Sequence, residues 1–356
     1  MIAFALGTTL GDGTSPPRPG VASQLTPEQL AGQRVVVGFG GVEPPAALRR
    51  MVREGRVTGV ILFAENLSSQ TAARRLIGDL QAIPRPAGLR DPLLVMVDQE
   101  GGLVKRVDGA PDASAREMGA RGVAFSREQG RRAARNLRGL GINVNLAPVL
   151  DVARPGGTIA ATGRGFGSTA PEVSGTAVPF AVAMQEGGVA ATAKHFPGIG
   201  AARENTDFAV ERVDLSREEL RRVDEAPYRR FVAAGGALVM LSSAIYPAIS
   251  PRPAAFARQI ATGELRRRHG FEGVSITDAL ETVAVRDFGG PARAALAATS
   301  AGVDLLLFTD YQAGAQAQRA LTRRLRRAPA ARSDFELAVG RVLRLRRSAL
   351  RSDPMP

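Results

Sequence analysis

The chain has 356 residues, of which 44% are hydrophobic and 23% are charged. These proportions are typical of globular proteins, and they exclude a disordered or collagen-like chain. The sequence contains no cysteine and two histidines, which excludes disulfides, a cysteine nucleophile and a zinc site with several imidazole ligands. The formal net charge is +13, which raises the question of an acidic partner.

The basic residues are nearly all arginine, with lysine only at Lys105 and Lys194. This bias, together with abundant alanine, glycine and proline, is typical of GC-rich coding rather than of selection for a charged surface. Many of the arginines fall on predicted helices, where a solvated helix face is their ordinary interpretation. Aromatic residues make up 5% of the chain and tryptophan is absent, so the sequence offers no base-stacking platform. We therefore expect no nucleic-acid partner.

The two ends of the chain differ in composition from its centre. Residues 1–6 are apolar but too few to cross a membrane, and no other apolar run approaches the length of a membrane helix. The first residues are either the remnant of a trimmed export signal or part of a flexible tail, so a cytoplasmic and an exported location both stay open. We expect flexible tails at residues 1–24 and 351–356.

From about Leu25 onward, short apolar runs alternate with longer helical patterns. Such near-continuous apolar runs are typical of parallel strands that are covered on both faces. The eight predicted strands are 34–39, 59–63, 93–97, 143–147, 190–193, 237–241, 273–277 and 303–307. The clearest predicted helices are 126–140, 172–186, 217–234, 291–301 and a terminal helix at 333–350.

Eight successive strand–helix units predict an α/β fold, specifically a TIM (β/α)8 barrel. An open, doubly wound sheet is the alternative, but no glycine-rich dinucleotide fingerprint follows the first predicted strand. No linker is long enough to divide the chain. We therefore expect a single domain over residues 25–350, with the terminal helix packed on its outside.

Polar residues follow many of the predicted strands, at the end where the sites of TIM barrels lie. They are Asp98, Glu100, Asn145, Asp151, Lys194, His195, Ser242, Ser243, Asp278 and Asp310. Lys194 is one of two lysines in an arginine-rich chain, which favours a role that needs a compact ammonium group. Asp278 ends the seventh strand, where it could act on a ligand or cap the following helix. We expect His269, which precedes that strand, at the surface.

Five motifs in this order resemble those of glycoside hydrolase family 3, and in particular its single-domain bacterial β-N-acetylglucosaminidases. The resemblance extends from about Gln33 to Leu350. The motifs are VDQEGG at 97–102, NLAPVLDVA at 145–153, GRGFG at 163–167, KHFPG at 194–198 and ITDAL at 276–280.

This resemblance implies a TIM-barrel enzyme that removes terminal β-linked N-acetylglucosamine with retention of configuration, from cell-wall (peptidoglycan-derived) or related glycans. In such an enzyme Asp278 would be the nucleophile. The residues that would hold the sugar are Asp98, Arg106, Arg164, Lys194 and His195. The resemblance implies neither a cofactor nor a metal, and it favours a monomer.

The sequence departs from the family pattern in one loop, which reads KHFPGIGAARENTDF at 194–208. In the resembled enzymes a histidine that acts as acid/base stands where this chain has Asp207, and the aspartate that holds it stands where this chain has Asn205. Two hypotheses follow. Either Asp207 or Glu204 takes over proton transfer, or the protein is an impaired member that binds aminosugars or hydrolyses them weakly.

Overall fold

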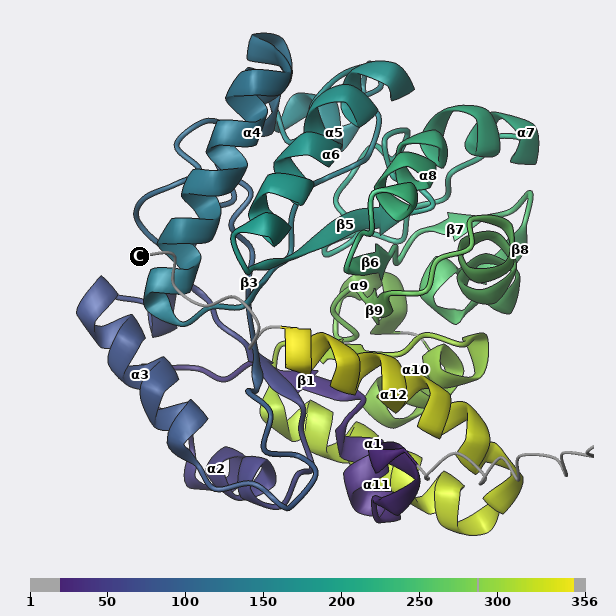
Figure 1. The fold of residues 1–356 in the computed structure, drawn as a ribbon. Helices are drawn as coiled ribbons and strands as arrows, with labels where there is room; N and C mark the ends of the chain where they lie inside the picture. Colours follow the sequence, from purple (N-terminus) through teal and green to yellow (C-terminus); the bar gives the residue numbers. More distant parts are fainter. Residues whose placement is uncertain (1–19, 287, 349–356) are drawn as a thin grey trace, which may run out of the picture.

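The computed structural model describes residues 20–286 and 288–348. Its main sheet contains eight parallel strands in the order β10-β1-β2-β3-β4-β5-β6-β9. Figure 1 shows strands of this sheet, among them β1, β3, β5 and β6, at the centre of the molecule. Their bounds are Val35–Val37 (β1), Gly59–Ile61 (β2), Leu94–Val97 (β3), Val144–Asn145 (β4), Ala190–Phe196 (β5), Leu238–Leu241 (β6), Val274–Thr277 (β9) and Leu306–Phe308 (β10). A parallel bridge between Ile276 and Leu305 joins β9 to the β10 segment and closes the circle. The predicted TIM barrel and all eight of its strands are confirmed.

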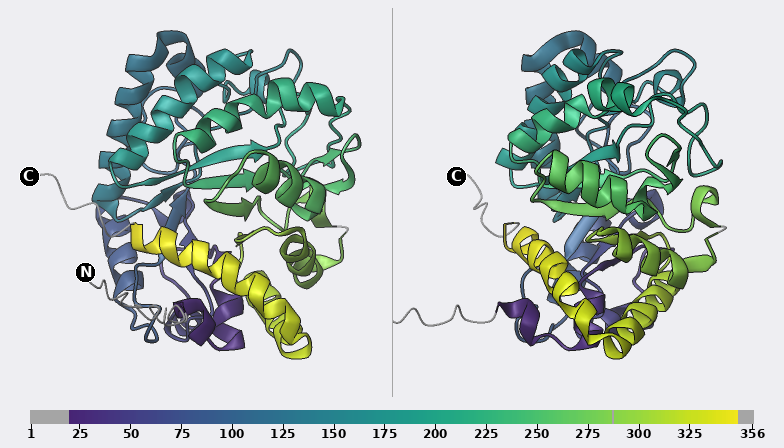
Figure 2. Two further views of the ribbon diagram at one scale, coloured as in Figure 1. Left: turned by 45° about the vertical axis from the view of Figure 1, so that its right-hand side comes forward. Right: turned by 90° about the vertical axis from the view of Figure 1, so that its right-hand side faces the viewer.

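The helices surround these strands (Figures 1 and 2). Their bounds are Pro27–Gly32 (α1), Ala46–Arg53 (α2), Gln70–Ala82 (α3), Ala115–Leu140 (α4), Thr158–Ala161 (α5), Ala170–Glu186 (α6), Arg217–Glu219 (α7), Ala226–Ala233 (α8), Val283–Arg286 (α9), Gly290–Ala301 (α10), Tyr311–Arg327 (α11) and Arg332–Ser348 (α12). Local sequence defines their ends. The Ser114 and Thr169 side chains accept hydrogen bonds from backbone N–H groups in the first turns of α4 and α6. Gly141 ends α4 with a φ of 87°, a left-handed conformation that favours glycine.

Two elements differ from the sequence prediction. The helix expected over 217–234 is divided into α7, a π-helical segment Leu220–Asp224 and α8. Pro227 lies near the start of α8, where its missing N–H is tolerated, but it would break a continuous α-helix at this point. A small antiparallel hairpin of Ile245–Tyr246 (β7) and Ser250–Pro253 (β8) was not predicted, because its strands are too short to show a periodic pattern.

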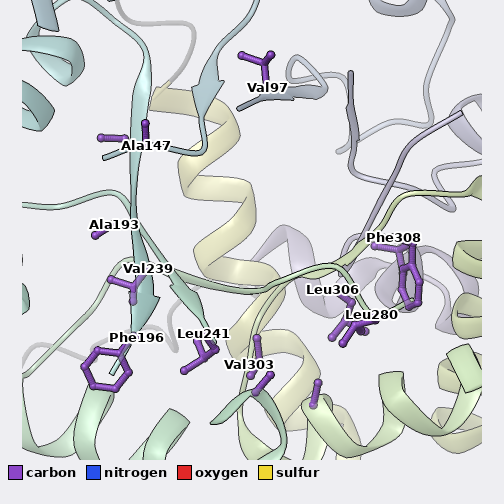
Figure 3. Packing of buried hydrophobic residues seen from close by; sticks show 14 of the residues in the cluster. Val97, Ala147, Ala193, Phe196, Val239, Leu241, Leu280, Val303, Leu306 and Phe308 are labelled. Carbon is purple, nitrogen blue, oxygen red and sulfur yellow. The ribbon is translucent and has the colours of Figure 1, made fainter. Parts of the chain in front are cut away.

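Side chains of the strands alternate between two apolar cores. On β3, Leu94 and Met96 point into the barrel, whereas Val95 and Val97 belong to the cluster between strands and helices. Figure 3 shows part of this outer cluster, with Val97 on β3 and Phe308 on β10. The strands are apolar on both faces because each face packs against one of these two cores.

Helix α12 covers the amino-terminal end of the barrel. Its residues Val342 and Leu345 pack with Leu94 and Met96 in the interior cluster, so this end of the barrel is filled. In Figure 2 the helix, coloured yellow, runs along one side of the strands. Helix α12 thus fills the amino-terminal end of the barrel interior, and the carboxyl ends of the strands form its open mouth.

The described part of the chain begins inside the expected N-terminal tail. A short 3₁₀ helix at Val21–Gln24 lies near α12, and its Ala22 is buried. Residues 1–19, which include the apolar start of the chain, and residues 351–356 of the expected second tail lie outside the described residues. No helix among the described residues is both long and apolar enough to cross a membrane.

Candidate active site

A cavity of about 340 Å³ opens at the carboxyl ends of the strands. This volume lies near the lower end of the range for small-molecule sites. The polar side chains that line it are Asp98, Glu100, Arg106, Arg164, Lys194, His195, Asn205, Asp207, Asp278, Glu281, Thr282 and Thr309. All the catalytic and sugar-binding residues that the family resemblance and the proton-transfer hypothesis name are therefore brought together here, except Glu204. Of the other polar residues that follow strands, Glu100 also lines the cavity, whereas no lining side chain comes from Asn145, Asp151, Ser242, Ser243 and Asp310. Glu204 is exposed and does not line the cavity.

A buried ionic network forms the side of the cavity that is built by β3, β5 and the segment after β4. The Lys194 ammonium lies 2.7 Å from Asp98 Oδ1 and 2.8 Å from Glu100 Oε1. Arg164 binds both oxygens of Glu100, at 2.9 Å and 2.7 Å. This fork geometry fixes the guanidinium, and Glu100 thus orients two cations toward the cavity.

The charges of this network stabilise one another. Burial alone would raise the pKa of the Glu100 carboxyl, but Lys194 and Arg164 outweigh it and hold that pKa well below its usual range. Burial alone would lower the pKa of Lys194, yet Asp98 and Glu100 outweigh it and raise that pKa. Both groups are therefore charged at neutral pH, and the cations are ready to donate hydrogen bonds to a neutral polar ligand.

Glu100 lines the cavity, although the sequence motifs alone give it no role. The position of Glu100 in the sequence could have identified it as a site residue. Glu100 is an even number of residues from Leu94 and Met96, which face the barrel interior. Side chains on an extended segment alternate, so residues of this parity continue toward the mouth of the barrel. Asp98 shares the same parity and also lines the cavity.

His195 on β5 is held by a buried aspartate, Asp151, from the preceding strand unit. Asp151 Oδ2 lies 2.8 Å from His195 Nδ1, and Asp151 Oδ1 accepts hydrogen bonds from the backbone N–H groups of His195 and Ile199. The Asp151 carboxylate therefore fixes the position and orientation of the His195 ring in the cavity wall. The peptide bond between Lys194 and His195 is cis.

Asp278 directly follows β9 and is partly buried in the cavity wall. Its Oδ1 accepts a hydrogen bond of 2.8 Å from the N–H of Ala279. Burial raises the pKa of the Asp278 carboxyl, and Asp207 acts in the same direction, whereas His195 and Lys194 oppose them. Helix α9 begins at Val283, so Asp278 does not cap it and the capping alternative is wrong.

Asp207 reaches the cavity from the loop after β5. Asn205 Nδ2 donates to Asp207 Oδ2 at 3.1 Å, and the Asp207 N–H donates to Asn205 Oδ1 at 3.0 Å. The backbone carbonyl of Asp207 accepts from the N–H of Val283, which ties this loop to the segment after Asp278. This one hydrogen bond joins the Asp207 loop to the segment after Asp278 at the same mouth, while Asn205 orients the Asp207 carboxyl within its own loop.

Comparison with known proteins identifies this arrangement. Residues 27–345 match the Glycosyl hydrolase family 3 N terminal domain. The chain belongs to glycosyl hydrolase family 3. An uncharacterized secreted glycosyl hydrolase of Arthroderma benhamiae is 41% identical over 81% of this chain and 83% of its own length. A beta-hexosaminidase of Stenotrophomonas maltophilia is 33% identical over 77% of this chain and 82% of its own length.

Solved structures agree with this assignment. A family 3 beta-N-acetylglucosaminidase from Paenibacillus sp. is 35% identical, with a TM-score of 0.84 over 93% of this chain and 64% of that one. A beta-N-acetylhexosaminidase from Beutenbergia cavernae is 31% identical, with a TM-score of 0.84 over 90% of this chain and 98% of that one. The protein is thus a glycosyl hydrolase with the family's barrel, and the cavity at the strand ends is its candidate active site.

Two further features of this glycosyl hydrolase concern its titratable groups. The prediction that His269 lies at the surface is wrong, since its side chain is 5% exposed and its Nε2 is 2.8 Å from the buried Glu225 carboxylate. Among the described residues, no group of three or more His, Cys, Asp or Glu side chains is arranged to hold a metal ion. In the cavity, Asp98 and Glu100 are paired with cations, Asp278 accepts from a backbone N–H, and Asp207 accepts from the Asn205 side-chain amide.

Replacing Asp151 by asparagine is expected to destabilise the fold and to loosen His195. The amide cannot accept hydrogen bonds at both positions, so one buried donor loses its partner. Loss of a hydrogen bond to a buried charged group costs about 1.5–3 kcal/mol. Urea unfolding of the two proteins at pH 7 measures this loss, and equal free energies of unfolding would contradict the role assigned to Asp151.

A pH-dependent stability is expected from Glu281, whose pKa burial raises to about 7. In the unfolded chain the pKa of a glutamate carboxyl is about 4.3. Between about pH 4.3 and pH 7 the folded protein therefore binds the Glu281 proton more tightly than the unfolded chain does. The stabilisation is complete at low pH and is lost as the pH rises through 7. Relative to Glu281→Gln, the wild type should therefore lose about 1–3 kcal/mol between pH 5 and pH 8, as measured by urea unfolding. A parallel pH dependence in the two proteins would contradict this assignment.

Proposed function

We propose that this protein is a retaining β-N-acetylhexosaminidase that removes terminal β-linked N-acetylglucosamine. The observation that carries the proposal is that Asp278 and Asp207 line one cavity together with the sugar-binding residues that the family resemblance implies. The hexosaminidase names of the relatives agree with it. A retaining mechanism requires such a pair, one group that attacks the anomeric carbon and one that transfers protons.

The reaction uses Asp278 as nucleophile. Arg164, Lys194 and Asp98 bind the hydroxyl groups of the terminal sugar, together with Arg106 and His195. An oxygen of Asp278 then attacks the anomeric carbon while Asp207 gives its proton to the departing glycosidic oxygen. This step forms a covalent glycosyl-enzyme. In the second step Asp207 takes a proton from water, the water oxygen attacks the anomeric carbon, and Asp278 leaves as a carboxylate. Two displacements at one carbon restore the β configuration.

We assign the proton transfer to Asp207 rather than to Glu204. Both residues are exposed, but Asp207 lines the cavity and is linked to the segment that follows Asp278, whereas Glu204 lies outside the cavity. A carboxylic acid can replace an imidazole in this role, since a carboxyl group can both give a proton to the leaving oxygen and take one from water. The described residues offer no observation in favour of an impaired, sugar-binding member, since a carboxyl group stands at the required position.

The proposal extends to the unit that acts. We infer that residues 25–350 form one catalytic domain, that this domain works as a monomer, and that its substrates derive from cell-wall peptidoglycan or related glycans. The family resemblance favours the monomer. Light scattering of the purified protein tests the monomer, and release of N-acetylglucosamine from muropeptides tests the substrate.

A panel of p-nitrophenyl glycosides tests the function directly. The β-N-acetylglucosaminide should be hydrolysed at least tenfold faster than the β-glucoside and the α-N-acetylglucosaminide, because the site binds one sugar in one orientation. Proton NMR of the first-formed product should show the β anomer. A first-formed α anomer would exclude the retaining mechanism, and failure to hydrolyse any member of the panel would exclude the proposed function.

A further inference from the structure

Glu281 is a cavity residue to which the proposed mechanism gives no task. It lies three residues after Asp278 and lines the same cavity. Its Oε1 accepts hydrogen bonds from the backbone N–H groups of Thr309 at 3.0 Å and Asp310 at 3.2 Å. Its Oε2 is buried and has no hydrogen-bond partner among the described residues. One oxygen thus fixes the side chain, and the other stays free.

An unpaired buried carboxylate oxygen is costly. Polar atoms that lose water without gaining a partner destabilise a protein, and most buried polar atoms in native structures have a partner. The raised pKa of Glu281 reflects the same burial. The two backbone N–H groups hold the carboxyl in this position, so Oε2 cannot turn toward another donor of the protein. A ligand bound in the cavity can supply the missing hydrogen-bond donor.

The position of Glu281 indicates which part of a ligand it meets. The ionic network of Lys194, Arg164 and Glu100 lies on the β3 to β5 side of the mouth, and Asp278 follows β9. Glu281 is fixed to the end of β10, on the opposite side. The neighbouring cavity wall there includes Phe63 from the end of β2 and Leu307 from β10, which are apolar. On that side Glu281 offers an unpaired carboxyl oxygen to a sugar that the network already holds.

We propose that Glu281 is a specificity-determining residue whose free Oε2 accepts a hydrogen bond from an O–H or N–H group of the bound sugar. The inference rests on the proposed function, because it takes the occupant of the cavity to be N-acetylglucosamine. It adds a contact on the side of the sugar that faces away from Lys194. Ligands that lack the matching donor bind less tightly because they leave this oxygen unpaired.

Titration calorimetry with N-acetylglucosamine, the reaction product, tests the contact without requiring turnover. Glu281→Gln keeps one oxygen for the two backbone N–H groups but places an amide NH₂ where the free oxygen was. Glu281→Ala removes both oxygens. We expect the dissociation constant to rise about fivefold or more in the glutamine variant and roughly tenfold to hundredfold in the alanine variant.

Glu272→Gln is the matched control, because Glu272 is exposed and precedes β9 at the opposite end of the same strand. It should bind N-acetylglucosamine as the wild type does. Titrations with glucose and with 6-deoxy-N-acetylglucosamine show whether the donor is the amide or the 6-hydroxyl group. If a sugar lacks the group that donates to Glu281, its dissociation constant should be the same for the variants and the wild type. If the donor is another hydroxyl group, the variants should bind every one of these sugars more weakly than the wild type does.

The outcomes separate the two proposals. If the wild type binds N-acetylglucosamine and both Glu281 variants match it within twofold, the contact is absent and this inference is wrong while the proposed function stands. If the wild type does not bind the sugar, the proposed function fails and the inference fails with it. Urea unfolding of both variants confirms that binding is compared between folded proteins.

Discussion

Replacement of Asp278 by alanine should lower the rate of hydrolysis of p-nitrophenyl β-N-acetylglucosaminide by at least about 10³-fold. The residue ends β9 in the wall of the cavity, and its carboxylate is the group proposed to form the bond to the anomeric carbon. Without it, the covalent intermediate cannot form, and the positioning of the sugar alone supports little reaction. Steady-state kinetics on both proteins measure the effect.

Added azide identifies the role of the missing group. In Asp278→Ala a small anion can enter the space of the carboxylate and attack the anomeric carbon from the same side, which gives the α-glycosyl azide. Thin-layer chromatography and NMR identify this product. Asp310→Ala is a suitable comparison, because Asp310 caps α11 and does not line the cavity. Turnover at the wild-type rate in Asp278→Ala would exclude the proposed nucleophile and with it the mechanism.

The barrel could be predicted from the sequence because its signal is local and repeated. Runs such as 93–97 are apolar on both faces, and the structure explains this with two cores, one on each side of the strands. The strand ends then define the mouth, so Asp98, Lys194 and Asp278 fall into one site by topology alone.

The remaining features depend on contacts between distant segments, which no local pattern encodes. Asp151 lies on the segment after β4, and its partner His195 belongs to β5. The partners of Glu281 come from the end of β10. The arginine-rich sequence around His269 predicts a surface position, yet the His269 side chain is buried against Glu225 from a distant segment. In each case a polar residue is explained only by a neighbour that the fold supplies.

The loop after β5 shows how far resemblance alone can guide an assignment. Its sequence lacks the histidine of the resembled enzymes, and this absence left an impaired protein as one hypothesis. The structure places Asp207 in the cavity and pairs it with Asn205, which donates a hydrogen bond to one carboxylate oxygen. Such a neutral partner orients the carboxyl while leaving its second oxygen for proton transfer. The substitution thus replaces a charged dyad with a carboxyl–amide pair.

Replacement of Asp207 by alanine should therefore produce an effect that depends on the leaving group. General acid catalysis contributes roughly 10²–10⁴-fold, and it matters most when the departing oxygen is a strong base. Hydrolysis of an alkyl or oligosaccharide β-N-acetylglucosaminide should fall by this factor. The first step with a dinitrophenyl glycoside should change little, because dinitrophenolate departs without a proton. Pre-steady-state measurement of dinitrophenolate release compares the two directly.

Glu204→Ala is the matched control, because Glu204 lies three residues earlier on the same loop but outside the cavity. Its rates should equal those of the wild type on every substrate. Azide should accelerate turnover of Asp207→Ala and give the β-glycosyl azide, since the anion now attacks the glycosyl-enzyme from the face that water normally uses. Acceleration in Glu204→Ala instead would transfer the proton-transfer role to Glu204. The α product from Asp278→Ala and the β product from Asp207→Ala together distinguish the two carboxylates by the face of the sugar that each one serves.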